Sequence, residues 1–224
     1  MRYIFLIATI ILFGCSDTPI ENTASGNLTP EAMIGKGDSL DPDSEPQVSN
    51  DSEVPYFYQY DNELHPSASC QNTSVAMVLA HLGWSGRPDD ITREWGKDYA
   101  QSPDGLNYMF NNIVNESELP GSLWTTISGG LEEFRSAAAS GNVIIVHGYF
   151  TGYGHVLVVT GYDGSHYTVN DPAGEWNGQF GGGYTDQPED GQTVEYSAAQ
   201  FEAAIATSDG RSFLPIWYHV LRRF

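Results

Sequence analysis

Cys70 is the residue of this sequence best suited to covalent chemistry. It lies in the stretch SASCQNTSVAMVLAHLG, whose apolar residues recur with helical spacing from about Ser69 to Leu82. In the first turn of a helix a thiolate is stabilised by orphan N–H groups and by the positive end of the helix dipole. This position predicts a nucleophile, although a cysteine there can also be a small buried hydrophobic residue.

A thiolate nucleophile needs a base and a group that orients the base, and one predicted hairpin supplies both. His155 begins the run HVLVVTGY, and Asp171 ends the next run, HYTVND, after the turn residues DGS. Adjacent antiparallel strands bring such side chains together, so we expect His155 to be the base and Asp171 the orienting carboxylate. Asn170 stands beside Asp171, and a shift of one residue in register would exchange the two.

The other histidines suit this role less well. His81 lies about three turns along the predicted helix, His65 in a loop and His147 inside an apolar strand, while His166 and His219 have no carboxylate at a comparable offset. No cluster of His, Cys and Asp has the spacing of zinc ligands, so we expect neither a metal nor another cofactor.

Hydrolysis through a thiolate also needs a donor for the oxyanion that forms on the attacked carbonyl. Gln59 precedes the cysteine in VPYFYQY, an extended segment that a short loop can fold beside the start of the helix. The backbone N–H of Cys70 would be the partner donor. On its own, Gln59 is an ordinary polar residue of an extended segment.

The order of the predicted elements favours an α+β fold, because helices dominate the first half of the domain and strands the second. Further helices are predicted at 88–99, 106–114, 130–139 and 198–206, and strands at 142–150, 155–162, 167–171 and 213–221.

Four motifs, taken together, resemble the papain-like cysteine peptidases: VPY with Gln59, the stretch around Cys70, the run GHVLVVTGY and the sequence VNDP. The nearest group is the one similar to bacteriocin-processing, double-glycine peptidases. The resemblance implies a papain-like fold, with a helical N-terminal part packed on a C-terminal antiparallel β-sheet. It also implies that Cys70 is the nucleophile, His155 the base and acid, Asp171 the orienting residue and Gln59 the oxyanion donor.

One departure from these peptidases and two neighbouring segments bear on the predicted site. Many such peptidases have glycine after the cysteine, where this chain has Gln71 and Asn72. Aromatic residues at 148–153 are either the lining of a substrate cleft or plain core. The glycine-rich loop at 174–184 is either a lid or a surface loop without a role.

The N-terminus carries an export signal. Met1 and Arg2 precede an apolar run from Tyr3 to Phe13, too short for the about 20 residues of a membrane-spanning helix. The sequence LFGC resembles a bacterial lipobox, which implies cleavage before Cys15 and lipid on its sulfur. An ordinary signal peptide with an incidental cysteine is the alternative. If Cys15 carries lipid, Cys70 has no cysteine of the chain to pair with.

We therefore divide the chain into a lipoprotein signal peptide with its lipobox cysteine (1–15), an acidic linker of disordered composition (16–53) and one peptidase-like domain (54–224). The expected location is the bacterial cell envelope, with the exported protein held by its lipid anchor. Ser16, rather than aspartate, favours the outer membrane or cell surface. The formal charge of −20 argues against nucleic acid as a partner.

The expected function is a membrane-anchored cysteine hydrolase that cleaves peptide or amide bonds of a peptide or protein substrate through a Cys-His-Asp triad and a thioester intermediate. Papain-like folds also host cell-wall amidases and acyl or transglutaminyl transferases, which stay open as alternatives. A non-catalytic peptide-binding lipoprotein is a third.

Overall fold

The computed structural model describes residues 53–184, 191–206 and 215–224. Cys15 and the predicted signal peptide lie outside these residues, as does the predicted linker apart from Glu53. Within the described part, no helix has the length and apolar character needed to cross a membrane.

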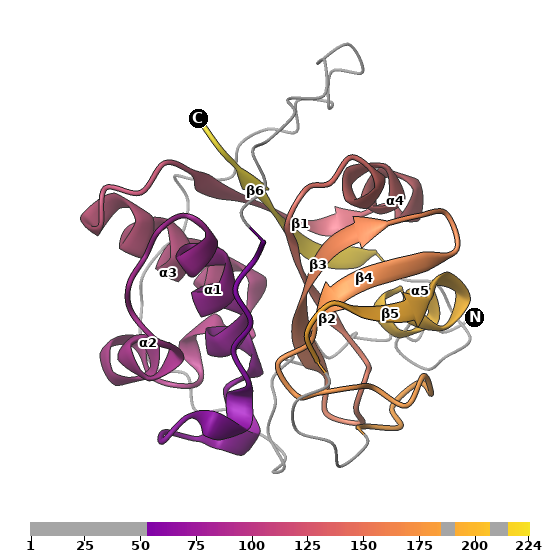
Figure 1. Ribbon diagram of the computed structural model, residues 1–224, viewed down its shortest axis with the longest axis horizontal. Coiled ribbons are helices and arrows are strands. Elements are labelled where there is room, and N and C mark those ends of the chain that lie inside the picture. The colour runs from indigo at the N-terminus through magenta and orange to yellow at the C-terminus, as the bar shows by residue number, and fades with distance from the viewer. Residues whose placement is uncertain (1–52, 185–190, 207–214) are drawn as a thin grey trace, which may run out of the picture. The chain divides into compact units, whose positions relative to one another are not determined.

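Six strands form one antiparallel sheet, in the order β1-β6-β2-β3-β4-β5 (Figure 1). The strands are β1 (Ser122–Gly129), β2 (Ile144–Gly148), β3 (His155–Tyr162), β4 (His166–Asn170), β5 (Val194–Ser197) and β6 (Ile216–Arg222). The helices are α1 (Cys70–His81), α2 (Pro88–Trp95), α3 (Pro103–Glu116), α4 (Leu131–Ala139) and α5 (Ala198–Ile205), with 3₁₀ turns η1 (Gln59–Asp61), η2 (Pro66–Ala68) and η3 (Tyr99–Gln101). The predicted α+β class is confirmed.

Helices cover both faces of the sheet, α1 to α3 on one and α4 and α5 on the other (Figure 1). Strand β3 shows why its sequence is a continuous apolar run. Val156 and Val158 pack in the core beneath α1, while Leu157 and Val159 alternate into the core beneath α4 and α5. A strand buried on both faces needs apolar side chains at every position. The packing on both faces holds β3, and with it His155, in a fixed position.

Helix α1 lies in the core and is buried along most of its length. Val75, Val78 and Leu79, part of the predicted apolar stripe, are fully buried in the cluster shared with the sheet. The helix ends at His81, and Gly83 follows the C-cap Leu82 with φ of 99°, in the left-handed region that glycine adopts most easily. The predicted helix at 69–82 is therefore confirmed, with Ser69 as its N-cap.

Two strands were not predicted, and one helix is shorter than predicted. β1 and β5 carry no clear apolar alternation, and each is defined by pairing with a partner strand, β6 and β4 respectively. The helix predicted at 88–99 ends at Trp95, because Gly96 leaves the helical conformation with φ of 77°. The first residues of the strand predicted at 213–221 lie outside the described residues.

A buried pair of histidines joins neighbouring strands. His147 Nε2 lies 2.9 Å from His219 Nε2, and His219 Nδ1 lies 2.6 Å from Thr125 Oγ1. Asn107 Nδ2 donates to the same Thr125 oxygen at 2.6 Å, so the histidine pair is also linked to α3. One of the two Nε2 atoms carries the hydrogen that joins the rings. Burial keeps the pair neutral.

Acid should therefore destabilise the fold through this pair. Burial lowers the pKa of His147 to about 3, and burial followed by the neighbouring His147 lowers the pKa of His219 well below its ordinary value. Below the unfolded pKa of about 6.5 the unfolded chain binds protons that the folded chain does not. We expect the free energy of unfolding in urea to fall by up to about 1.4 kcal/mol per pH unit for each histidine between roughly pH 6 and pH 4.

His219→Gln should reduce this pH dependence, whereas His166→Gln, at the exposed first residue of β4, should leave it unchanged. Equal slopes for the wild type and His219→Gln would contradict the assignment.

Candidate active site

His155 and Asp171 meet as the sequence predicted. His155 is the first residue of β3, and Asp171 directly follows β4, the next strand of the hairpin. His155 Nε2 lies 2.8 Å from Asp171 Oδ1, and both side chains are buried, with residue exposures of 1% and 0%. An ionised carboxylate only accepts hydrogen bonds, so Nε2 carries the proton and Nδ1 of the neutral ring is left with a lone pair. That nitrogen can act as a base.

The turn before β3 fixes where the imidazole begins. Gly154 has φ of 89°, a conformation that a residue with a side chain rarely adopts. Thr151 Oγ1 donates to Gly154 O at 2.7 Å and closes the turn. His155 is then paired with Gly148 of β2. The turn before His155 and the strand pairing of His155 thus fix the backbone position from which the imidazole extends.

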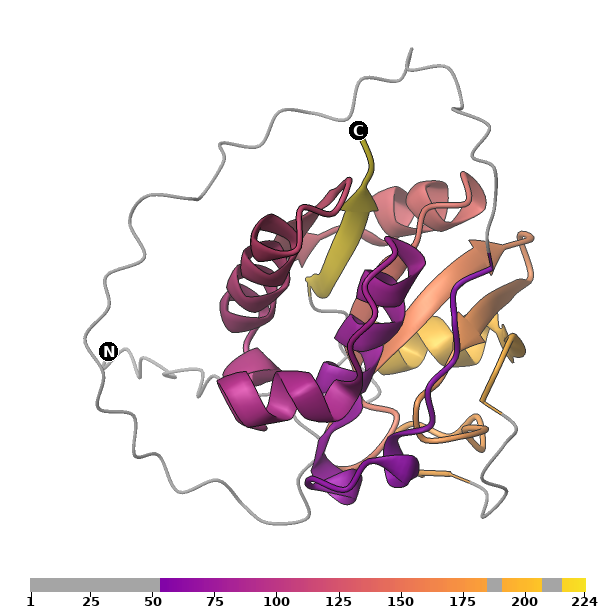
Figure 2. The same ribbon diagram turned by 60° about the vertical axis from the view of Figure 1, so that its left-hand side comes forward.

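The side chain of Asn170 makes its hydrogen bonds to backbone atoms and not to His155. Its Nδ2 donates to Val54 O at 2.9 Å, and its Oδ1 accepts from Thr193 N at 2.9 Å. Asn170 therefore ties the N-terminal extended segment to the sheet, and this segment runs beside the orange strands in Figure 2. The hydrogen-bond pattern supports Asp171 rather than Asn170 as the partner of His155.

Cys70 begins α1, next to the start of β3. Ser74, one turn further along α1, donates from Oγ to Val156 O at 3.0 Å, and Val156 directly follows His155. Asn62 holds the start of the helix from outside, because its Nδ2 donates to Ser69 Oγ at 2.9 Å and to Thr73 Oγ1 at 2.9 Å. These hydrogen bonds therefore hold the start of α1 next to the start of β3, where His155 lies.

Cys70 is disulfide-bonded in the structure. The sequence predicted an unpaired Cys70 only on the condition that Cys15 carries lipid, and that condition stays a prediction. A disulfide sulfur is not a nucleophile, so any chemistry at Cys70 needs the reduced form. Gln71 lies beside it, with Oε1 3.2 Å from Sγ and Nε2 bonded to the carbonyls of Ala68 and Lys97.

Gln59 is buried close to both halves of the site. Its backbone N–H donates to Pro172 O at 2.8 Å, next to Asp171, and its Nε2 donates to Pro66 O at 3.0 Å, in the turn that leads into α1. An amide NH₂ group has two hydrogens, and the bond to Pro66 uses one of them. The other can serve as the donor to an oxyanion.

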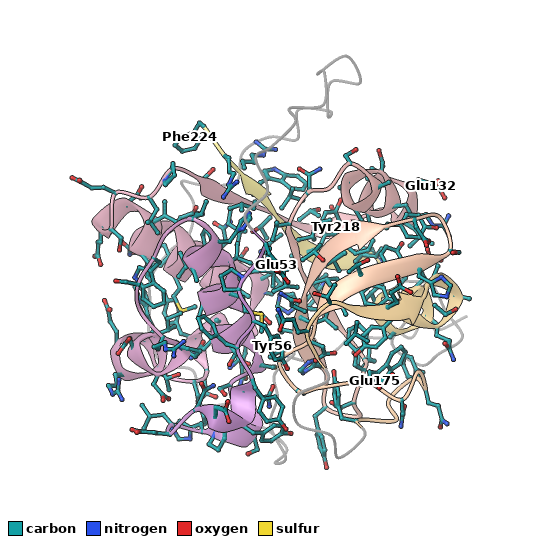
Figure 3. The ribbon with its side chains drawn as sticks, in the orientation of Figure 1. Glu53, Tyr56, Glu132, Glu175, Tyr218 and Phe224 are labelled. Atoms are coloured by element: carbon teal, nitrogen blue, oxygen red, sulfur yellow. The ribbon has the colours of Figure 1, made fainter. Side chains whose placement is uncertain are left out.

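Three tyrosines around Asp171 were not predicted as site residues. Tyr184 and Tyr196 each donate to Asp171 Oδ2, at 3.0 and 3.1 Å, and Tyr56 donates to Asp171 O at 3.0 Å. Figure 3 shows Tyr56 between α1 and the strands, in line with its position in the VPY motif. The sequence signal for Tyr56 was this motif; Tyr184 and Tyr196 had none.

The loop at 174–184, which the sequence left open as a lid or a surface loop, is hydrogen-bonded to the residues just before β3. Gly181 N donates to Tyr149 O at 2.7 Å, and Gly183 N donates to Phe150 O at 3.0 Å. Phe150, in the aromatic run at 148–153, is fully buried, and its ring packs edge-on against Trp176 and His155. At this position the run forms core behind the histidine.

Comparisons with known proteins give one family match and solved structures with a similar fold. The model of the Peptidase_C39 like family matches residues 52–202. A solved structure from Bacillus anthracis, described as a C39-like peptidase, aligns with a TM-score of 0.51 at 16% identity, over 76% of this chain and 95% of that one. A double-glycine motif protease from an AMS/PCAT transporter, solved in complex with the leader peptide, aligns with a TM-score of 0.45 at 18% identity, over 77% of this chain and 93% of that one. No curated protein matches.

Proposed function

Since the chain belongs to the Peptidase_C39 like family, we propose that it is a cysteine peptidase in which Cys70, His155 and Asp171 form the catalytic triad and Gln59 donates to the oxyanion. The observation that carries the proposal is the buried 2.8 Å hydrogen bond between His155 Nε2 and Asp171 Oδ1. The hairpin that holds this pair also accepts the hydrogen bond from Ser74 near the start of α1.

In the proposed reaction His155 Nδ1 takes the proton from the reduced Cys70 thiol. The thiolate attacks the carbonyl carbon of the scissile bond, and the oxyanion accepts hydrogen bonds from Gln59 Nε2 and from the Cys70 backbone N–H. The imidazolium then gives its proton to the leaving amine as the C–N bond breaks, which leaves a thioester on Cys70. Water activated by His155 attacks the thioester, releases the carboxylate product and restores the thiol.

The test is cleavage of peptides by the protein kept in a reductant. We expect hydrolysis that is lost when Cys70 is alkylated. Amidase activity on cell-wall peptides, or transfer of the acyl group to an added amine, would support the alternative reactions on the same fold. Peptide binding without turnover in the reduced wild type would favour the non-catalytic alternative and contradict the proposal.

We also propose that Cys15 carries lipid and holds the exported protein in the bacterial cell envelope, which is supported by the LFGC sequence alone. A thioether at Cys15 would also remove its sulfur from disulfide exchange. Cys15→Ser should move the protein from the membrane fraction to the soluble fraction, whereas Cys70→Ser should leave it with membranes. A Cys15→Ser variant that still fractionates with membranes would contradict the anchor.

A further inference from the structure

The two oxygens of the Asp171 carboxylate have different partners. Oδ1 accepts from His155 Nε2 at 2.8 Å and from Ala173 N at 3.1 Å. Oδ2 accepts from two phenols, those of Tyr184 at 3.0 Å and Tyr196 at 3.1 Å. Among the salt bridges of the described residues, Asp171 takes part only in the one with His155. Hydrogen bonds must therefore stabilise most of this buried charge.

Tyr196 is held so that its hydroxyl hydrogen is directed to the carboxylate. Its Oη accepts from Trp176 N at 2.7 Å, which uses the oxygen as an acceptor. Two acceptors remain for its hydrogen, Asp171 Oδ2 at 3.1 Å and Gly174 O at 3.4 Å. The carboxylate is closer and charged, so it is the stronger acceptor. A chain of hydrogen bonds thus runs from Trp176 N–H through Tyr196 and Asp171 to His155.

Tyr184 reaches the same oxygen from the anchored loop. Its ring also packs against the His155 imidazole, with centroids 5.0 Å apart and planes at 61°. Burial, followed by the charge of Asp171, raises the pKa of both Tyr184 and Tyr196 above the ordinary value. Both phenols therefore keep their protons and donate throughout the pH range in which a peptidase works.

We propose that Tyr184 and Tyr196 are positioning residues of the hydrolysis, which hold the Asp171 carboxylate so that Oδ1 stays aligned with His155 Nε2. The inference rests on the proposed function. A carboxylate bonded at only one oxygen can turn about its Cβ–Cγ bond, whereas two donors on Oδ2 fix its plane. The donors also draw negative charge away from Oδ1, so the imidazolium is held less tightly and releases its proton to the leaving amine more readily.

The test is Tyr196→Phe, which keeps the ring in its core and removes only the hydroxyl group. Because the variant loses the hydrogen bond from the Tyr196 hydroxyl to the charged Asp171 carboxylate, we expect kcat to fall about tenfold with KM nearly unchanged. With one donor fewer, the carboxylate holds the imidazolium more strongly. The acidic limb of the pH profile of kcat/KM, where protonation of the base ends activity, should therefore move to higher pH by a few tenths of a unit as an order-of-magnitude estimate.

Tyr167→Phe is the matched control. Tyr167 is also a buried phenol of the sheet, but its hydroxyl donates to Glu202 Oε1 at 3.0 Å rather than to Asp171. We expect this variant to keep the kcat and pH profile of the wild type. A Tyr196→Phe variant that behaves like Tyr167→Phe in both respects would overturn the inference.

A readout that needs no substrate separates this inference from the proposed function. The proton on His155 Nε2 can be observed by NMR in ¹⁵N-labelled protein, and its exchange with water should be faster in Tyr196→Phe than in the wild type. If Cys70→Ala keeps its activity, the proposed function fails whatever this proton does. If Cys70→Ala is inactive while the proton and kcat of Tyr196→Phe match the wild type, the inference alone fails.

Discussion

Cys70→Ala and His155→Ala are each expected to lose at least about 10⁴-fold in kcat on any peptide that the reduced wild type cleaves. The first variant lacks the nucleophile and cannot form the thioester. The second keeps the thiol but lacks the base that takes its proton and the acid that protonates the leaving amine. Initial rates of peptide cleavage at fixed substrate concentration measure both effects.

One control variant and one control measurement keep these losses interpretable. His166→Ala changes an exposed histidine at the turn of the same hairpin and should keep wild-type activity. Circular dichroism and thermal melting show whether Cys70→Ala and His155→Ala remain folded. A folded Cys70→Ala variant with full activity would mean that the protein is not a cysteine hydrolase.

Asp171→Ala and Gln59→Ala are expected to be slow but measurable. Loss of Asp171 leaves the nucleophile and the base in place but frees the imidazole to rotate and to take the wrong tautomer, a loss of about 10³-fold to 10⁴-fold in kcat. Loss of Gln59 removes one oxyanion donor and should cost about 10²-fold to 10³-fold. Both effects should appear in kcat more than in KM, because they act on the transition state.

Asn170→Ala is the matched control for Asp171→Ala. Its two hydrogen bonds hold Val54 O and Thr193 N, so its loss should lower stability by about 1–3 kcal/mol while kcat stays near that of the wild type below the melting temperature. If Asn170→Ala loses activity while still folded and Asp171→Ala does not, the third member of the triad is misassigned.

The local parts of the site could be predicted from the sequence. Helix α1 and its N-cap followed from apolar spacing and from Gly83, and the pairing of His155 with Asp171 followed from two apolar runs joined by a short turn. Such features depend on contacts between residues that are close in the chain. The sequence did not decide whether Asn170 or Asp171 orients His155, because a shift of one residue in the strand register exchanges the two. The hydrogen bonds of Asn170 to distant backbone atoms favour Asp171.

The surroundings of Asp171 could not be predicted, because they depend on contacts between distant segments. Tyr196 lies in β5, a short strand of four residues whose place in the sheet comes only from pairing with β4. Gly191 shows the same dependence: its backbone O accepts from Asp171 N at 2.7 Å, and a Cβ at this glycine would lie 2.1 Å from Asp171 O and 2.4 Å from Tyr56 Oη. Nothing in the sequence near Gly191 indicates that crowding.

The most direct test of the central claim is the rate at which iodoacetamide alkylates Cys70 in the reduced protein as a function of pH. An activated thiolate should react at about pH 6 far faster than a thiol with the ordinary pKa of about 8.5, and His155→Ala should slow the reaction. Mass spectrometry of the peptide that contains Cys70 gives the rate without any substrate. Slow alkylation that rises only above about pH 8, and that is the same in His155→Ala, would mean a structural cysteine and would contradict the account.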